Sequence, residues 1–84
     1  MKITIYTKDF CPACSRAKLL LANNKFQFEE IKIGSDITRE QVLEMFPDAK
    51  TVPIIIINDN RIGGADDLKL LVESGDINLL WIMH

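Results

Sequence analysis

Two cysteines, Cys11 and Cys14, are the residues of this chain whose type and spacing best suit chemistry. They are its only cysteines, and the Cys-X-X-Cys spacing allows reversible oxidation to a disulfide. The pair follows a strand-like segment, residues 2–6, and precedes a helix-like run from Ser15. Because unpaired backbone N–H groups at a helix N-terminus stabilise a thiolate, this position predicts dithiol redox chemistry.

The two cysteines are predicted to have different roles. Disulfide exchange requires a thiolate, and helix-start amides together with Lys8, three residues upstream, favour a thiolate at Cys11. Cys11 is therefore the candidate nucleophile. Cys14 lies one turn into the helix, where its thiol should be less exposed, and it is the candidate resolving cysteine. Its attack on a mixed disulfide at Cys11 would close an intramolecular disulfide.

Two other interpretations of the cysteine pair are weaker. A permanent structural disulfide would restrain little, because it closes a very short loop in a compartment expected to be reducing. A Cys-X-X-Cys pair is also half of a zinc site, but the chain has no second cysteine pair and its only histidine is His84. No bound metal is therefore expected.

The composition is that of one small globular domain, residues 1–84, with 48% hydrophobic and 26% charged residues. A net charge of −2 gives no electrostatic reason to expect a nucleic-acid partner. The longest apolar run, residues 52–57, is much shorter than the roughly 20 residues of a membrane span. Since residues 1–2 lead directly into a β-rich run and not into a signal peptide, a cytoplasmic location is expected.

The pattern of apolar residues predicts an α/β fold with the element order β-α-β-α-β-β-α. Strands are expected over residues 2–6, 25–33, 53–58 and 61–62. The first two strands, joined by a helix, should be parallel, and the last two should form a hairpin around a turn at Asp59-Asn60.

Helix caps and apolar faces predict where the helices lie. Helices are expected over residues 15–22, 39–46, 66–74 and, as a short last helix, 77–83. Thr38 and Gln41 match a capping box at the start of the second helix, and Pro47 and Gly75 mark helix ends. Four aromatic residues have the spacing of core or near-core positions: Phe26, Phe28, Phe46 and Trp81.

Four segments of the chain resemble glutaredoxins. They are Tyr6-Thr7-Lys8, Cys11-Pro12-Ala13-Cys14 with Arg16-Ala17-Lys18, Thr51-Val52-Pro53, and Gly63-Gly64-Ala65-Asp66-Asp67-Leu68. Together they extend the resemblance over nearly the whole chain. The resemblance implies a thioredoxin-like fold, a four-stranded mixed β-sheet flanked by helices. It also implies glutathione-dependent thiol–disulfide exchange, with glutathione as co-substrate and no tightly bound cofactor.

The resemblance further implies a glutathione site beside the cysteines. Its residues would be Lys8, Ala13, Thr51, Val52, Pro53, Gly64, Ala65, Asp66 and Asp67. Lys8 would reach the glycyl carboxylate, and the amides at the start of the next helix would bind the γ-glutamyl carboxylate. Asp66 is favoured for the ammonium group, whereas Asp67 is equally well explained as a helix cap. Pro53 would be a cis-proline facing the disulfide, although a trans-proline at a strand start is the expectation from the residues alone.

Two positions depart from the family pattern. Ala13 stands where the family usually has an aromatic residue, most often Tyr, and this predicts a more open cleft. Ile54 stands where Gln is frequent, and we expect changed packing there without loss of the chemistry.

The sequence thus predicts a monomeric reductant of protein disulfides and glutathione mixed disulfides, an electron donor to reductases such as ribonucleotide reductase. Two alternatives stay open. One is a thioredoxin-like reductant served by a flavoprotein reductase. The other is a carrier of a glutathione-ligated 2Fe–2S cluster held between two protomers. The small Ala13 favours such a carrier and Pro12 disfavours it.

Overall fold

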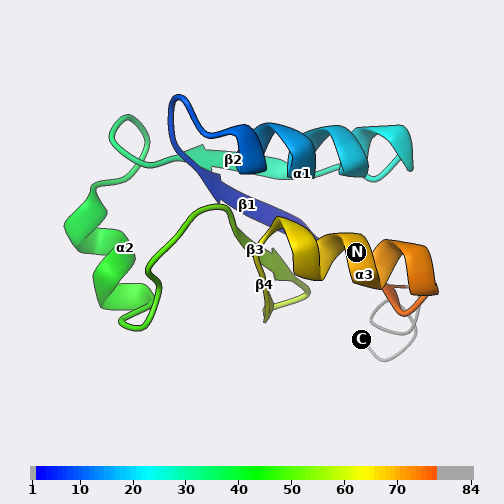
Figure 1. The fold of residues 1–84 in the computed structure, drawn as a ribbon. Coiled ribbons are helices and arrows are strands. Elements are labelled where there is room, and N and C mark those ends of the chain that lie inside the picture. The colour runs from blue at the N-terminus through cyan, green and yellow to red at the C-terminus, as the bar shows by residue number, and fades with distance from the viewer. Residues whose placement is uncertain (1, 78–84) are drawn as a thin grey trace.

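The computed structural model describes residues 2–77, and in that part of the chain four strands and three helices form an α/β domain (Figure 1). The elements are β1 (Ile3–Thr7), α1 (Pro12–Asn23), β2 (Glu29–Lys32), α2 (Arg39–Met45), β3 (Ile54–Ile57), β4 (Asn60–Gly63) and α3 (Ala65–Ser74). The sheet order is β2-β1-β3-β4. β1 is parallel to β2 and antiparallel to β3, and β3 is antiparallel to β4. The predicted four-stranded mixed sheet and element order are confirmed.

The second strand is shorter than predicted. Residues 25–28 do not belong to β2, because the chain is still completing the end of α1 there. The Lys25 N–H donates to the Ala22 carbonyl, the Phe26 N–H donates to the Leu21 carbonyl, and Lys25 has a φ of 63°. Phe26 nevertheless packs against the core, as does Phe28, so their predicted near-core positions are confirmed.

The hairpin turn lies one residue earlier than predicted. Asn58 and Asp59 form it, with φ values of 50° and 68°, and Asn60 already pairs with Ile57. Asn and Asp tolerate this left-handed conformation better than other non-glycine residues, which explains why they occupy the turn. The Asn58 side chain also accepts a hydrogen bond from the Lys2 N–H at 2.9 Å, so a contact 56 residues away in sequence helps to hold the turn.

The core lies between one face of the sheet and the helices α1 and α3, which run side by side across that face (Figure 1). Its buried members are Ile3, Ile5, Ala17, Leu21, Ile55, Ile57, Leu68 and Ile77. Burial alternates along β1, as expected when only one face of a strand is covered by helices. Burial of these side chains, at about 1.5–3 kcal/mol each, is the main favourable term in holding α1 and α3 on the sheet.

Helix α2 lies apart from α1 and α3 (Figure 1). Thr38 and Gln41 form the predicted capping box, and the helix ends at Met45, before Pro47. Its C-cap residue Phe46 is half-buried and packs edge-on against the Tyr6 ring, with 5.5 Å between ring centroids. Within the described residues, neither ring belongs to the core cluster or packs against it, so the core or near-core position predicted for Phe46 is wrong.

The predicted last helix over 77–83, with Trp81, falls outside the described residues apart from Ile77, which is buried. Among residues 2–77, no helix has the length and apolar character needed to cross a membrane.

Strand register brings the predicted site residues to one end of the sheet. Tyr6, near the C-terminal end of β1, pairs with Ile54, so residues 51–53 lie beside that end. Ile55 in turn pairs with Gly63, which places the start of α3 there as well. The loop from β1 to α1 leaves from the same end. Segments that are some 40 residues apart in the sequence therefore meet around the N-terminus of α1.

Candidate active site

Cys11 is the N-cap residue of α1, and its sulfur takes part in the capping. The Cys14 N–H donates a hydrogen bond to Cys11 Sγ at 3.1 Å, and the Ser15 N–H donates to the Cys11 carbonyl at 3.1 Å. The helix begins at Pro12, because proline suits the first helical position, where no N–H is needed. Partial positive charge at this helix start favours a thiolate at Cys11.

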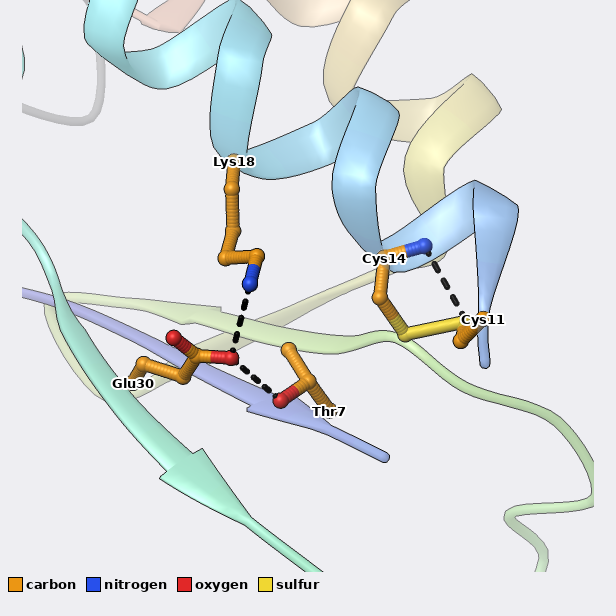
Figure 2. The surroundings of a disulfide bond; sticks show 5 residues. All are labelled: Thr7, Cys11, Cys14, Lys18 and Glu30. Carbon is orange, nitrogen blue, oxygen red and sulfur yellow. Dashed lines mark hydrogen bonds and ion pairs between the residues drawn. A yellow bond between two sulfur atoms is a disulfide. The ribbon is translucent and has the colours of Figure 1, made fainter. Parts of the chain in front are cut away.

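The two cysteines form a disulfide in the structure, with their Cα atoms 5.2 Å apart (Figure 2). Their surroundings differ. Cys14 is only 2% exposed, whereas Cys11 is half-buried at the head of the helix. A sulfur that is accessible and contacted by an amide suits attack on an external disulfide, and a buried sulfur next to it suits intramolecular closure.

Lys8 lies between two cavities at this end of the molecule. A cavity of about 500 Å³ is lined by Lys8, Cys11 and Cys14, among others. A second cavity of about 510 Å³ is lined by Lys8, Thr51 and Val52, among others. Within residues 2–77 the exposed Lys8 ammonium makes no ion pair, so it can contact an anion in either cavity.

The Val52-Pro53 peptide bond is cis, as the family resemblance implied. Pro53 is buried, Val52 is half-buried and Thr51 is exposed. A Cβ atom built on Gly64 would meet only the Pro53 carbonyl oxygen, at 3.9 Å, an ordinary contact distance. The start of α3 therefore adjoins this segment, and the packing of the protein itself does not demand glycine at position 64.

Asp67 caps the start of α3. Its carboxylate accepts a hydrogen bond from the Gly64 N–H at 3.1 Å. Gly63 has a φ of 121°, and a Cβ atom there would collide with the Asp67 carboxylate, so this position requires glycine. The capping interpretation of Asp67 therefore agrees with the structure.

The remaining predicted binding residues lie around the starts of α1 and α3. Ala65 and Asp66 line a smaller cavity of about 190 Å³ together with Arg16 of α1. The Asp66 side chain is exposed. Ala13 is half-buried at the second position of α1.

A hydrogen-bonded group beside the disulfide was not predicted from the sequence (Figure 2). The Thr7 hydroxyl donates to Glu30 Oε2 at 2.6 Å, and Lys18 Nζ lies 3.0 Å from the same oxygen. The Thr7 hydrogen bond, followed by Lys18, holds the pKa of the Glu30 carboxyl below its usual value. Lys18 and Glu30 also line the cavity that contains the cysteines. No local sequence signal joins these three residues, because only strand pairing places Glu30 beside β1.

Comparison with known proteins decides the family. The glutaredoxin family model matches residues 3–62 of the chain. The chain belongs to the glutaredoxin family. It is 37% identical over 78 residues to glutaredoxin 3 of Escherichia coli K12, covering 93% of this chain and 94% of that protein. It is 42% identical over 80 residues to a probable glutaredoxin of Synechocystis, covering 94% and 73% respectively.

The fold agrees with this assignment. The solution structure of a glutaredoxin from Brucella melitensis superposes with a TM-score of 0.79 at 38% sequence identity, covering 95% of this chain and 87% of that one. Glutaredoxins are glutathione-dependent thiol–disulfide oxidoreductases, so this glutaredoxin is an enzyme of that class. The spacing of Cys11 and Cys14 is that of the family's redox-active pair.

Proposed function

We propose that this glutaredoxin reduces protein disulfides and glutathione mixed disulfides, with Cys11 as nucleophile and Cys14 as resolving cysteine. The single observation that carries the proposal is the asymmetry of the pair. Cys11 sulfur accepts an amide hydrogen bond at a helix start, and Cys14 is 2% exposed. In the first step the Cys11 thiolate attacks one sulfur of the substrate disulfide and expels the other as a thiolate.

The second step uses the buried cysteine. Cys14 gives up its proton and attacks the Cys11 sulfur, which forms the Cys11–Cys14 disulfide seen in the structure and releases the substrate's second thiol. Two glutathione molecules then restore the dithiol. The first attacks the Cys11 sulfur, forms a mixed disulfide there and releases Cys14 as a thiol. The second attacks the glutathione sulfur of that mixed disulfide, releases the Cys11 thiolate and leaves as glutathione disulfide. Two electrons pass from glutathione to substrate in each cycle.

The glutathione site of this proposal spans the three segments that strand register brings together. Lys8 binds the glycyl carboxylate, and the backbone of Thr51-Val52-Pro53 pairs with the cysteinyl part as an added strand would. The amides of Ala65 and Asp66, next to Gly64, bind the γ-glutamyl carboxylate at the start of α3. Asp66 pairs with the ammonium group. Support comes from the Lys8 ammonium, which makes no ion pair within residues 2–77, and from the room at Gly64 beside Pro53.

Asp67 has a supporting role in this proposal, because its carboxylate already accepts the Gly64 N–H. Ala13 has only a methyl side chain, so the cleft beside Cys11 is open, which favours bulky protein disulfides over small ones.

We also propose that the enzyme works as a monomer in the cytoplasm. Its protein substrates would be reductases that become oxidised in turnover, ribonucleotide reductase being the example expected from the family.

The decisive experiment is turnover of a small glutathione mixed disulfide with glutathione as the only reductant. We expect sustained turnover that saturates with glutathione. Turnover that occurs only when a flavoprotein disulfide reductase replaces glutathione would contradict the proposal and favour the thioredoxin-like alternative. Visible absorbance from an iron–sulfur cluster after anaerobic purification would favour the cluster-carrier alternative.

A further inference from the structure

Phe10 is an aromatic residue that the fold leaves in solvent directly beside the reactive cysteine. Its relative exposure is 102%, against 66% for Leu70 and 61% for Leu19, the next most exposed large hydrophobic residues of the described chain. Single exposed apolar residues are ordinary on protein surfaces. Phe10 differs from them because it precedes Cys11 and has a φ of 57°, a left-handed conformation that is uncommon for a bulky side chain.

The helix start does not use the Phe10 ring. Phe10 occupies the position before the N-cap, from which an apolar side chain often packs against the fourth residue of the helix. In α1 that fourth residue is Ser15, which is polar and exposed, so Phe10 has no such packing partner. Phe10 is also absent from the hydrophobic cluster that holds α1 on the sheet.

The loop that carries Phe10 is held by polar contacts. Asp9 Oδ1 lies 3.2 Å from Lys32 Nζ, which ties the loop to the end of β2. The Thr7 carbonyl at the start of the loop accepts a hydrogen bond from the Ile33 N–H at 2.8 Å. The ring is therefore presented to solvent from an anchored turn, and neither anchor involves it.

Phe10 borders the same open cavity of about 500 Å³ as Cys11 and Pro12. Ala13 offers only a methyl group, so Phe10 supplies the largest apolar surface next to the nucleophile in sequence. Glutathione is charged at both ends and has no apolar side chain, so it gains little from such a ring. A polypeptide with an apolar residue next to its disulfide gains burial of both surfaces.

We propose that Phe10 is a specificity-determining contact for polypeptide substrates, packing against an apolar side chain that neighbours the attacked cysteine. This inference rests on the proposed function, because it requires that Cys11 attacks the substrate disulfide. It names a substrate class: polypeptide disulfides flanked by apolar residues, preferred over polypeptide disulfides flanked by polar residues.

The test uses two glutathionylated peptides that differ only in the residue next to their cysteine, Leu in one and Gln in the other. The kcat/KM of each is measured with glutathione as reductant, beside that of a small glutathione mixed disulfide without a peptide. We expect the wild-type protein to prefer the leucine peptide by roughly five- to tenfold, the scale expected for burying part of one aromatic ring. Phe10→Ala should remove this preference and leave the small disulfide unchanged.

Three further variants control the experiment. Phe10→Asn removes the ring with a residue that tolerates a positive φ, and it should also lose the preference. Phe10→Tyr keeps the ring and should retain the preference. Leu70→Ala removes an exposed apolar side chain from α3 and should change nothing.

The proposal is overturned if Phe10→Ala keeps the preference for leucine, or if it slows both peptides and the small disulfide equally. Failure of the wild-type protein to turn over the small disulfide would instead contradict the proposed function, so the two failures are distinguishable.

Discussion

The N-termini of α1 and α3 lie at the same end of the sheet but are capped in different ways. Helix α1 is capped by the Cys11 sulfur, which accepts the N–H of Cys14. Helix α3 has Gly64 as its N-cap, which offers no side chain, and Asp67 turns back to bind the Gly64 N–H. The first amides of α3 have no partner within the helix, as at any helix start. The positive end of α1 thus carries the proposed nucleophilic sulfur, and the positive end of α3 is the proposed site for an anion.

Helix α2 shows what a purely structural cap does. Thr38 accepts the Gln41 N–H at 3.1 Å, and the Gln41 side chain accepts the Thr38 N–H at 2.9 Å. These reciprocal bonds satisfy two backbone groups and leave no reactive atom at the helix start. The N-cap position is therefore the proposed nucleophile in α1, a structural cap in α2 and the glycine of the proposed anion site in α3.

Removing the cap sulfur of α1 should have the largest effect. Cys11→Ser should abolish exchange with every disulfide, because a serine hydroxyl does not ionise at neutral pH. Cys14→Ser should retain reduction of glutathione mixed disulfides, since glutathione can resolve the intermediate. Initial rates and alkylation of each single mutant near pH 6 measure this. Faster alkylation at Cys14 than at Cys11 would reverse the assigned roles.

Removing one charged residue of the proposed glutathione site, either at the start of α3 or in the loop after β1, should have the next largest effect. Asp66→Ala and Lys8→Ala should each raise the KM for glutathione about three- to tenfold, the cost of one solvent-accessible charged contact. Alkylation of Cys11 should be little changed. Asp67→Ala is the matched comparison, and it should mainly lower the melting temperature, because the Gly64 N–H loses its acceptor. An unchanged KM in both Asp66→Ala and Lys8→Ala would contradict the proposed site.

Removing the cap of α2 should lower stability without changing the chemistry. Thr38→Ala should cost about 1 kcal/mol of unfolding free energy, which corresponds to a melting temperature lower by roughly 4–8 °C in a domain of this size. The rate of exchange per folded molecule should equal that of the wild-type protein. Thermal unfolding followed by circular dichroism, with activity measured well below the transition, provides the check. A parallel loss of activity would mean that α2 contributes to the site.

Acid should weaken the attachment of α1 to the sheet, and this is the smallest predicted effect. In the folded protein Thr7 and Lys18 hold the pKa of the Glu30 carboxyl below its usual value of 4.5. The resulting stability is present above that value and is lost as the pH falls through the lowered pKa of the folded protein. The Glu30 side chain is 31% exposed, so solvent screens the contribution. The free energy of unfolding, measured with urea between pH 7 and pH 3, should fall less steeply for Glu30→Gln than for the wild-type protein. An equal fall in both proteins would assign the acid sensitivity to other groups.

Features set by neighbouring residues could be predicted from the sequence. The Cys-X-X-Cys pair, the capping box at Thr38 and Gln41 and the end of α3 at Gly75 all depend on hydrogen bonds within about four residues. The β-rich segment over residues 2–6 and the nearly continuous apolar run over residues 53–58 likewise indicated the strands β1 and β3. The family followed from motifs spread along the chain.

Strand register and packing decided the rest, because these depend on which distant backbones pair. The pairing of Tyr6 with Ile54 brings Val52-Pro53 to the end of β1, and the pairing of β1 with β2 places Glu30 where Thr7 and Lys18 reach it. Neither contact has a local sequence signal. The exposure of Phe10 is of the same kind: its apolar character favours burial, but no element within residues 2–77 covers the ring. The sequence by itself therefore determined the chemistry and the elements, and the tertiary structure determined which side chains meet around Cys11.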